Sequence, residues 1–205
     1  MALVKLNNRG VRSVSTFGSI SSLGTYTFIK KITASSSANV SFVNGSSDVV
    51  LDNTYKEYLF TFNNIHPSSD QKNFQVNFRD GGSDFDATKT TTVFLANHAE
   101  NDSFAALAYN TELDLAQSTS YQPLTENTGA DSDQGCTGIM HLYDPSSTTF
   151  VKHFIAHIHS CRHADAAELY TTAGYCNVTA AIDAVDFKFS SGNIDAGDIC
   201  LYGIN

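Results

Sequence analysis

The sequence predicts an all-β fold: an antiparallel β-sandwich of jelly-roll type with an extended N-terminal arm and little helix. Apolar and polar residues alternate with a period of two in many segments, and successive side chains of a strand point to opposite faces. Gly, Asn, Asp and Ser clusters separate these segments. Charged residues make up only 16 % of the chain and aromatic residues 11 %, which fits a β-rich protein with neutral polar outer faces. Strands with one apolar face each bury those faces in two packed sheets.

We expect about ten short strands. The clearest is 73–79, where Phe74, Val76 and Phe78 share one face. The same alternation aligns two further sets of side chains, Tyr58, Phe60 and Phe62 in 58–62 and Tyr26, Phe28 and Ile32 in 25–32. The remaining expected strands are 40–43, 49–51, 90–97, 138–143, 150–161, 169–178, 182–189 and 199–204.

Turns and the rare helical signals lie between these strands. Asn44-Gly45 separates 40–43 from 49–51 and predicts a hairpin turn there. The segments 104–109 and 111–117 are compatible with one helical turn or more, with Asp102 or Ser103 as N-cap. Apolar and polar residues also alternate in these segments, so a strand stays open as the alternative. We expect 118–135, which is rich in Thr, Asn, Asp and Gly, to be a long surface loop.

The length of 205 residues favours one domain, 25–205, preceded by the arm 1–24. The arm carries Lys5, Arg9 and Arg12, whereas the whole chain has a net charge of −9. Two interpretations stay open: a frayed terminus, or an arm that orders against another, acidic copy of the chain.

Charge and hydropathy exclude several partners. A nucleic-acid binder needs a basic stripe, and none is present in this sequence. Anionic membrane surfaces repel an acidic chain, and no apolar run approaches the ~20 residues of a membrane span. The first eight residues lack the apolar core of a signal peptide, so we expect folding in a cytoplasm.

The four cysteines, Cys136, Cys161, Cys176 and Cys200, lie in apolar stretches and form no CxxC motif. Three disulfide pairings are possible, and the sequence does not choose among them. In a reducing cytoplasm we expect four buried thiols.

One cluster resembles a metal site by residue type: His153, His157, His159, Cys161 and His163. On one strand these odd-numbered residues share a face, and two histidines in a His-x-His pair can bind one zinc ion. The competing interpretation, which we favour, is a polar, partly solvated strand face at a subunit contact. We therefore predict no metal, no cofactor and no catalytic residue, since nucleophile-elbow, phosphate-loop, dinucleotide and zincin motifs are all absent from the sequence.

Two further binding hypotheses rest on loops. Four acidic turn residues could bind calcium loosely, namely Asp84, Asp86, Asp131 and Asp133. They do not form an EF-hand, because the pattern that starts at Asp131 has Leu142 where Glu is required. A sugar site would need exposed aromatic residues, and in the absence of Trp we consider Tyr109, Tyr121 and Tyr170.

Both ends of the chain carry a resemblance. The start, MALVKLNNR (1–9), and the end, FKFSSGNIDAGDICLYGI (187–204), resemble those of small virion structural proteins of tailed phages from aquatic bacteria. The segments 27–31 and 146–154 are also similar to that group, whereas the His- and Cys-rich region at 161–163 departs from it.

The resemblance implies a non-enzymatic structural protein assembled in many copies on a virion. A capsid decoration, cement or adaptor-like protein would contact major capsid or tail proteins and copies of itself. The alternative is a tail appendage or receptor-binding module that recognises host surface carbohydrate.

Overall fold

The computed structural model of the chain describes residues 26–204, so the arm predicted for 1–24 lies outside the described residues. Residues 26–204 form strands, turns and loops and contain no helix. Their twelve strands are β1 (Tyr26–Ser37), β2 (Val40–Val43), β3 (Glu57–Pro67), β4 (Phe74–Arg79), β5 (Lys89–Ala99), β6 (Ala105–Tyr109), β7 (Gln122–Pro123), β8 (Cys136–Tyr143), β9 (Lys152–Arg162), β10 (Ala166–Cys176), β11 (Ala184–Phe189) and β12 (Ile194–Ile204).

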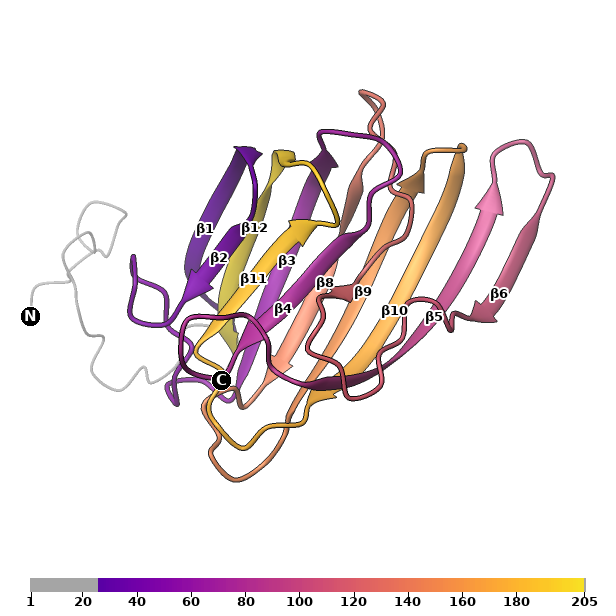
Figure 1. The fold of residues 1–205 in the computed structure, drawn as a ribbon. Coiled ribbons are helices and arrows are strands. Elements are labelled where there is room, and N and C mark those ends of the chain that lie inside the picture. The colour runs from indigo at the N-terminus through magenta and orange to yellow at the C-terminus, as the bar shows by residue number, and fades with distance from the viewer. Residues whose placement is uncertain (1–25, 205) are drawn as a thin grey trace, which may run out of the picture.

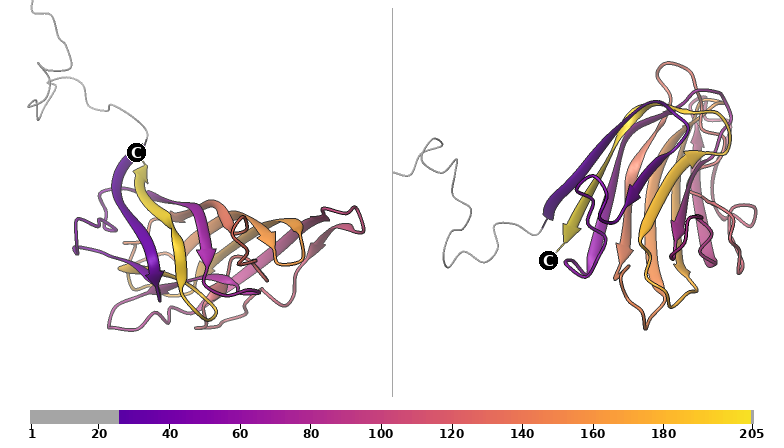
Figure 2. Two further views of the ribbon diagram at one scale, coloured as in Figure 1. Left: turned by 90° about the horizontal axis from the view of Figure 1, so that it is seen from above. Right: turned by 60° about the vertical axis from the view of Figure 1, so that its left-hand side comes forward.

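The strands form two antiparallel sheets (Figure 1). The larger sheet has eight strands in the order β1-β12-β3-β8-β9-β10-β5-β6, and the smaller has four in the order β2-β11-β4-β7. Figure 2 shows that the smaller sheet covers part of one face of the larger sheet, beyond which β5 and β6 project. The predicted all-β, antiparallel class is therefore confirmed.

The core lies between the two sheets. Phe60 and Phe62 of β3 meet Phe187 of β11 with ring centroids 5.3 and 5.1 Å apart. Phe42 of β2 approaches Phe60 in the same way, at 5.4 Å. Edge-on pairs at such distances add to the burial of large apolar surfaces, so this aromatic cluster holds the two sheets together. The alternation predicted for 58–62 and 73–79 is confirmed, because its apolar members are all buried.

The prediction for β1 is wrong in one respect. Tyr26 and Phe28 are exposed rather than buried, at 59 % and 57 %. The pairing with β12 shifts between Phe28 and Lys30, which is a β-bulge. One extra residue reverses the alternation, so Ile32 lies on the core side, where it packs against the buried cluster, while Phe28 lies on the opposite face.

Three local predictions also fail. Ala105–Tyr109 is a strand and not a helix, because it pairs residue by residue with β5. Asn44-Gly45 does form a turn, but 49–51 is not a strand, and β2 pairs with β11 instead. The segment 118–135 is only partly a surface loop, since it contains β7 and several fully buried residues, namely Gln122, Leu124, Thr125 and Thr128.

Two of these buried loop residues bond to the larger sheet, Gln122 to Thr91 of β5 and Thr128 to Ser160 of β9. Thr91 of β5 donates a hydrogen bond to the Gln122 side chain at 2.6 Å, and Gln122 donates one to the carbonyl of Leu113 at 2.9 Å. Leu113 in turn packs on Val93 and Tyr170 in a small second core. The polar composition of the loop therefore supplies hydrogen bonds beneath a sheet that the smaller sheet does not cover.

A row of buried side chains crosses the same sheet beside Thr91. Lys89 and Lys152 flank Cys176 in register, and both amines donate to backbone carbonyls of neighbouring loops. Burial lowers the pKa of Lys89 to about 8 and raises the pKa of Cys176 to about 12. The period-two pattern places these side chains on the inner face but does not reveal their partners.

Glu168 is a buried carboxyl group in β10, with only 2 % of its surface exposed. Its Oε2 accepts a hydrogen bond from the Tyr170 hydroxyl at 2.5 Å, and Arg162 lies 3.5 Å from its Oε1. Burial raises the pKa of Glu168 above its ordinary value, although the hydrogen bond and the nearby arginine oppose the shift.

We expect Glu168→Gln to become more stable relative to the unmodified chain as the pH rises from 4.5. A raised folded-state pKa means that the folded chain binds the proton more tightly than the unfolded chain does. The stability that this proton contributes is fully present below pH 4.5 and is lost as the pH rises through the folded-state pKa. Gln carries no charge and avoids this loss. Urea unfolding across a pH series measures the difference, and the exposed Glu112→Gln is the matched control. A stability difference that stays constant with pH would contradict the prediction.

Candidate functional site

The His-rich face of β9 is confirmed for four of its five predicted members. The strand alternates strictly, with Phe154, Ala156 and Ile158 buried on one side. The opposite side carries exposed or half-buried residues, namely His153, Ile155, His157, His159 and Cys161. His163 lies beyond the end of β9, in the turn before β10. This side is the outer face of the eight-stranded sheet, away from the smaller sheet.

The histidines do not converge on a common point. His157 Nδ1 lies 3.2 Å from the Thr171 hydroxyl on β10, and the His153 ring packs at 6.1 Å from that of Tyr175. Within residues 26–204 no three His, Cys, Asp or Glu side chains are arranged to hold a metal ion. Extension along the strand separates alternate side chains by ~7 Å, so each histidine finds a cross-strand neighbour instead of a shared ligand. The zinc hypothesis and the loose calcium hypothesis therefore find no ligand set there.

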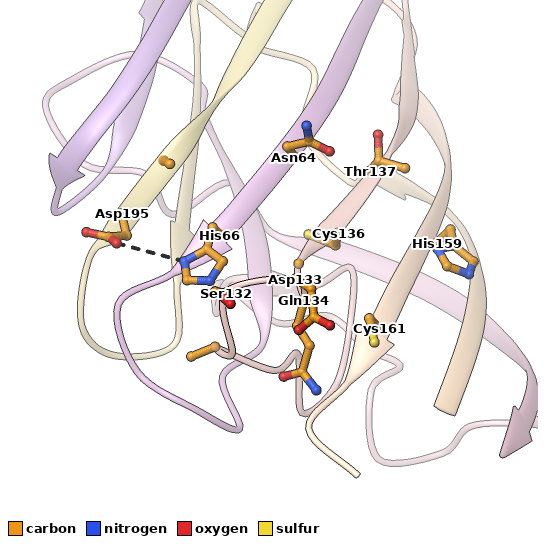
Figure 3. A pocket seen from close by; sticks show the side chains of 13 residues that line it. Asn64, His66, Ser132, Asp133, Gln134, Cys136, Thr137, His159, Cys161 and Asp195 are labelled. Carbon is orange, nitrogen blue, oxygen red and sulfur yellow. Dashed lines mark ion pairs between the residues drawn. The ribbon is translucent and has the colours of Figure 1, made fainter. Parts of the chain in front are cut away.

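A pocket of about 790 Å³ lies at one end of this outer face (Figure 3). Four strands and one loop line it: β3, β8, β9, β12 and the segment 130–135. The side chains drawn in Figure 3 combine hydrogen-bonding groups with two thiols and two imidazoles, and those labelled are Asn64, His66, Ser132, Asp133, Gln134, Cys136, Thr137, His159, Cys161 and Asp195.

The pocket holds a histidine beside a carboxylate and two thiols. His66 Nδ1 lies 3.9 Å from Asp195 Oδ2, and its Nε2 lies 3.2 Å from the carbonyl of Asp131. Burial, and then nearby carboxylates, raise the pKa of Cys161. Burial also raises the pKa of Cys136. A neutral thiol is a poor nucleophile, so what the pocket offers is a set of hydrogen-bond donors and acceptors.

The cysteines are all free, but only Cys136 and Cys176 are buried, whereas Cys161 and Cys200 are partly exposed. The expectation of four buried thiols is thus wrong for two of them. Both exceptions face outward because they occupy the outer positions of alternating strands.

The tyrosines considered for sugar stacking have different environments. Tyr170 is 1 % exposed and belongs to the second core. The Tyr121 hydroxyl bonds Asp186, and the Lys188 amine lies 3.9 Å from the centre of its ring. Tyr109, 43 % exposed on β6, is the one member of this trio with an open ring.

An exposed apolar surface lies around Tyr109, and sequence reasoning missed it. It consists of Phe94 on β5, Leu107 and Tyr109 on β6, and Leu169 on β10, with exposed fractions from 43 % to 77 %. We call these four residues the edge patch. Phe94 and Tyr109 are register partners with ring centroids 5.6 Å apart. The alternation in 104–109 indicates this strand, but the helical interpretation of the same segment predicts no exposed strand surface there.

The opposite edge of the same sheet also exposes aromatic side chains. Phe28 of β1 lies 5.6 Å from the ring of Tyr202 on β12, and Tyr26 begins the strand. Contiguous exposed apolar patches often mark contacts with other proteins, whereas single exposed apolar residues are ordinary. The outer face thus combines a pocket of mixed polar and apolar lining with exposed apolar side chains at each edge.

Comparison of the chain with family models, with curated proteins and with solved structures found no match. In the part of the chain that the structure describes, no helix has the length and apolar character needed to cross a membrane.

Proposed function

We propose that this chain is a non-enzymatic structural subunit of a tailed-phage virion, a capsid decoration, cement or adaptor-like protein held by contacts between subunits. The observation that carries the proposal is the outer face of the eight-stranded sheet, which no segment of residues 26–204 covers and which has exposed apolar side chains at β1 and at the edge patch. Burial of such groups between copies or against capsid or tail proteins stabilises assembly without any chemical step. The resemblance of both chain ends to phage virion proteins supports the same proposal.

The strand order supports a jelly roll as the basis of the fold. If β5, β6, β9 and β10 are set aside and the other eight strands are renumbered along the chain, the sheet orders become 1-8-3-6 and 2-7-4-5. These orders are compatible with a jelly roll, a fold that viral capsid proteins use repeatedly, and so they support the proposal. The four remaining strands then form an extension that widens one sheet and creates its outer contact surface.

The pocket at the end of the outer face favours a second candidate, a tail appendage that binds host surface carbohydrate. Its lining combines carboxylate, amide and hydroxyl groups from Asp133, Asn64 and Thr137, which suit a polyhydroxylated ligand. Among the described residues that line the pocket there is no Trp, Tyr or Phe side chain on which a sugar could stack, so the assembly role is the better supported of the two.

Immunogold labelling of purified phage particles tests the proposal. Antibody raised against the purified chain is expected to label particles at regular positions on the head or at its junction with the tail. Label confined to the distal end of the tail would support the carbohydrate-binding appendage instead. Particles that carry no label, while mass spectrometry also finds no peptide of the chain in them, would overturn both placements.

A further inference from the structure

The open edge of β6 differs from the edge strands of most soluble proteins. Edge strands are usually protected from pairing by charged residues, proline or a bulge. β6 has the sequence AALAY, which contains none of these residues, and all five positions are exposed. Its register with β5 runs without a shift from His98↔Ala105 to Phe94↔Tyr109. No strand within residues 26–204 pairs with the outer side of β6, so among the described residues its edge is regular and unprotected.

The hydrogen bonds at both ends of β6 define which backbone groups are free. Asn110 N–H donates to the Val93 carbonyl at 2.9 Å, and Ala99 N–H donates to the Phe104 carbonyl at 3.0 Å. Bonding positions alternate along an antiparallel strand, so the even-numbered residues face β5. The N–H and C=O groups of Ala105, Leu107 and Tyr109 consequently point to the open edge, where a further strand can pair with them.

The charge around this edge favours a basic occupant. Residues 90–151 contain no Lys or Arg but include eight acidic residues. Four of these flank β6 in the loops that precede and follow it, namely Glu100, Asp102, Glu112 and Asp114. Antiparallel pairing of β6 with the β6 of a second copy would place these acidic loops against each other. A basic segment avoids this repulsion and gains attraction.

The segment 1–24 of the chain has the required chemistry. It carries Lys5, Arg9 and Arg12 and no acidic residue, and it includes apolar residues such as Leu3, Val4 and Leu6 that suit a strand beside the edge patch. It precedes β1, which is the other edge strand of the same sheet. Fully extended, 24 residues span at most ~80 Å. The sheet of eight strands is only about 34 Å wide, so the segment is long enough to reach the β6 edge of an adjacent copy.

We propose that residues 1–24 of one copy add as a strand to the open edge of β6 in a neighbouring copy. The added strand pairs with the backbone of Ala105, Leu107 and Tyr109, covers part of the edge patch, and places its cations among the acidic loops. This inference rests on the proposed role in assembly, because it requires copies that lie side by side. Addition of a strand to an exposed sheet edge is a general mode of protein recognition.

A photo-crosslinking amino acid at position 107 of the full-length chain tests the proposal. Isotopically light and heavy copies are mixed and irradiated, and the digested products are identified by mass spectrometry. We expect crosslinks from position 107 to residues 1–24, with light joined to heavy, and a loss of these products at ~1 M salt, where charges are screened within about 3 Å. The same amino acid at the exposed position 150 is the control and should give none of them.

Each other outcome overturns the proposal. Crosslinks from position 107 to β6 or β1 of a second copy would show that a different segment pairs with the edge. Crosslinks that join only light to light and heavy to heavy peptides would show that residues 1–24 fold back on their own chain. No product at any protein concentration would show that the edge stays open. Particle labelling is independent of this experiment, so the proposed function and the strand addition can fail separately.

Discussion

Phe187→Ala is expected to lower the free energy of unfolding by about 4 kcal/mol, because it empties the centre of the core. Phe187 is fully buried and contacts rings from both sheets, with centroids at 5.3 Å for Phe60, 5.1 Å for Phe62 and 5.9 Å for Phe74. Removal of its ring loses the transfer energy of the side chain and leaves a cavity that three large neighbours cannot fill. Urea denaturation followed by tyrosine fluorescence or far-ultraviolet circular dichroism measures the change.

Phe150→Ala is the matched control for this prediction. Phe150 is 70 % exposed in the loop before β9, so the same substitution there should change stability by no more than about 0.5 kcal/mol. Equal effects of the two substitutions would mean that Phe187 does not join the sheets, and the packing of the two layers described above would be wrong.

The regular strands follow from side-chain periodicity, and the sequence is most informative where one face is buried. The alternation of Phe74, Val76 and Phe78 requires one face toward the core, and these residues are all fully buried. In β9 the same rule places the histidines on the outer face. A strand whose neighbours on both sides are strands has little freedom to violate this pattern.

The failures have local physical causes. The bulge after Phe28 is a pairing irregularity between β1 and β12, and a single strand read alone does not encode it. Ala105–Tyr109 lies at the edge of the sheet with no buried face, so Ala and Leu, which are good helix formers, bias the interpretation toward helix. The loop 118–135 is polar because its buried members supply hydrogen bonds to strands that are distant in the sequence, as Gln122 does with Thr91.

The candidate site was predictable only in part. Histidine spacing predicts a shared face on β9, but the pocket combines Asn64 of β3, Thr137 of β8 and Asp195 of β12, which only the sheet order brings together. The edge patch joins Phe94 and Leu107 with Leu169, and it depends in the same way on the pairing of β10 with β5 and of β5 with β6. Non-local pairings of this kind leave no periodic signal in the sequence.

The double substitution of Phe94→Ser with Leu107→Ser is expected to weaken association of copies by about a thousandfold. Each substitution removes about 2 kcal/mol of stabilisation that burial of the side chain would give in the assembled state, and every 1.4 kcal/mol is a factor of ten in affinity. Both residues face solvent in the isolated chain, so the variant should fold with nearly unchanged stability. Phe150→Ser, which removes an exposed ring outside the edge patch, should leave association unchanged.

Sedimentation equilibrium of the unmodified full-length chain tests most directly whether its outer sheet face joins copies to one another. A molar mass that corresponds to several chains, and that falls to one chain in the Phe94→Ser, Leu107→Ser variant at the same concentration, is the predicted result. A mass of one chain at every concentration, or an assembly that the double substitution does not affect, would contradict this account.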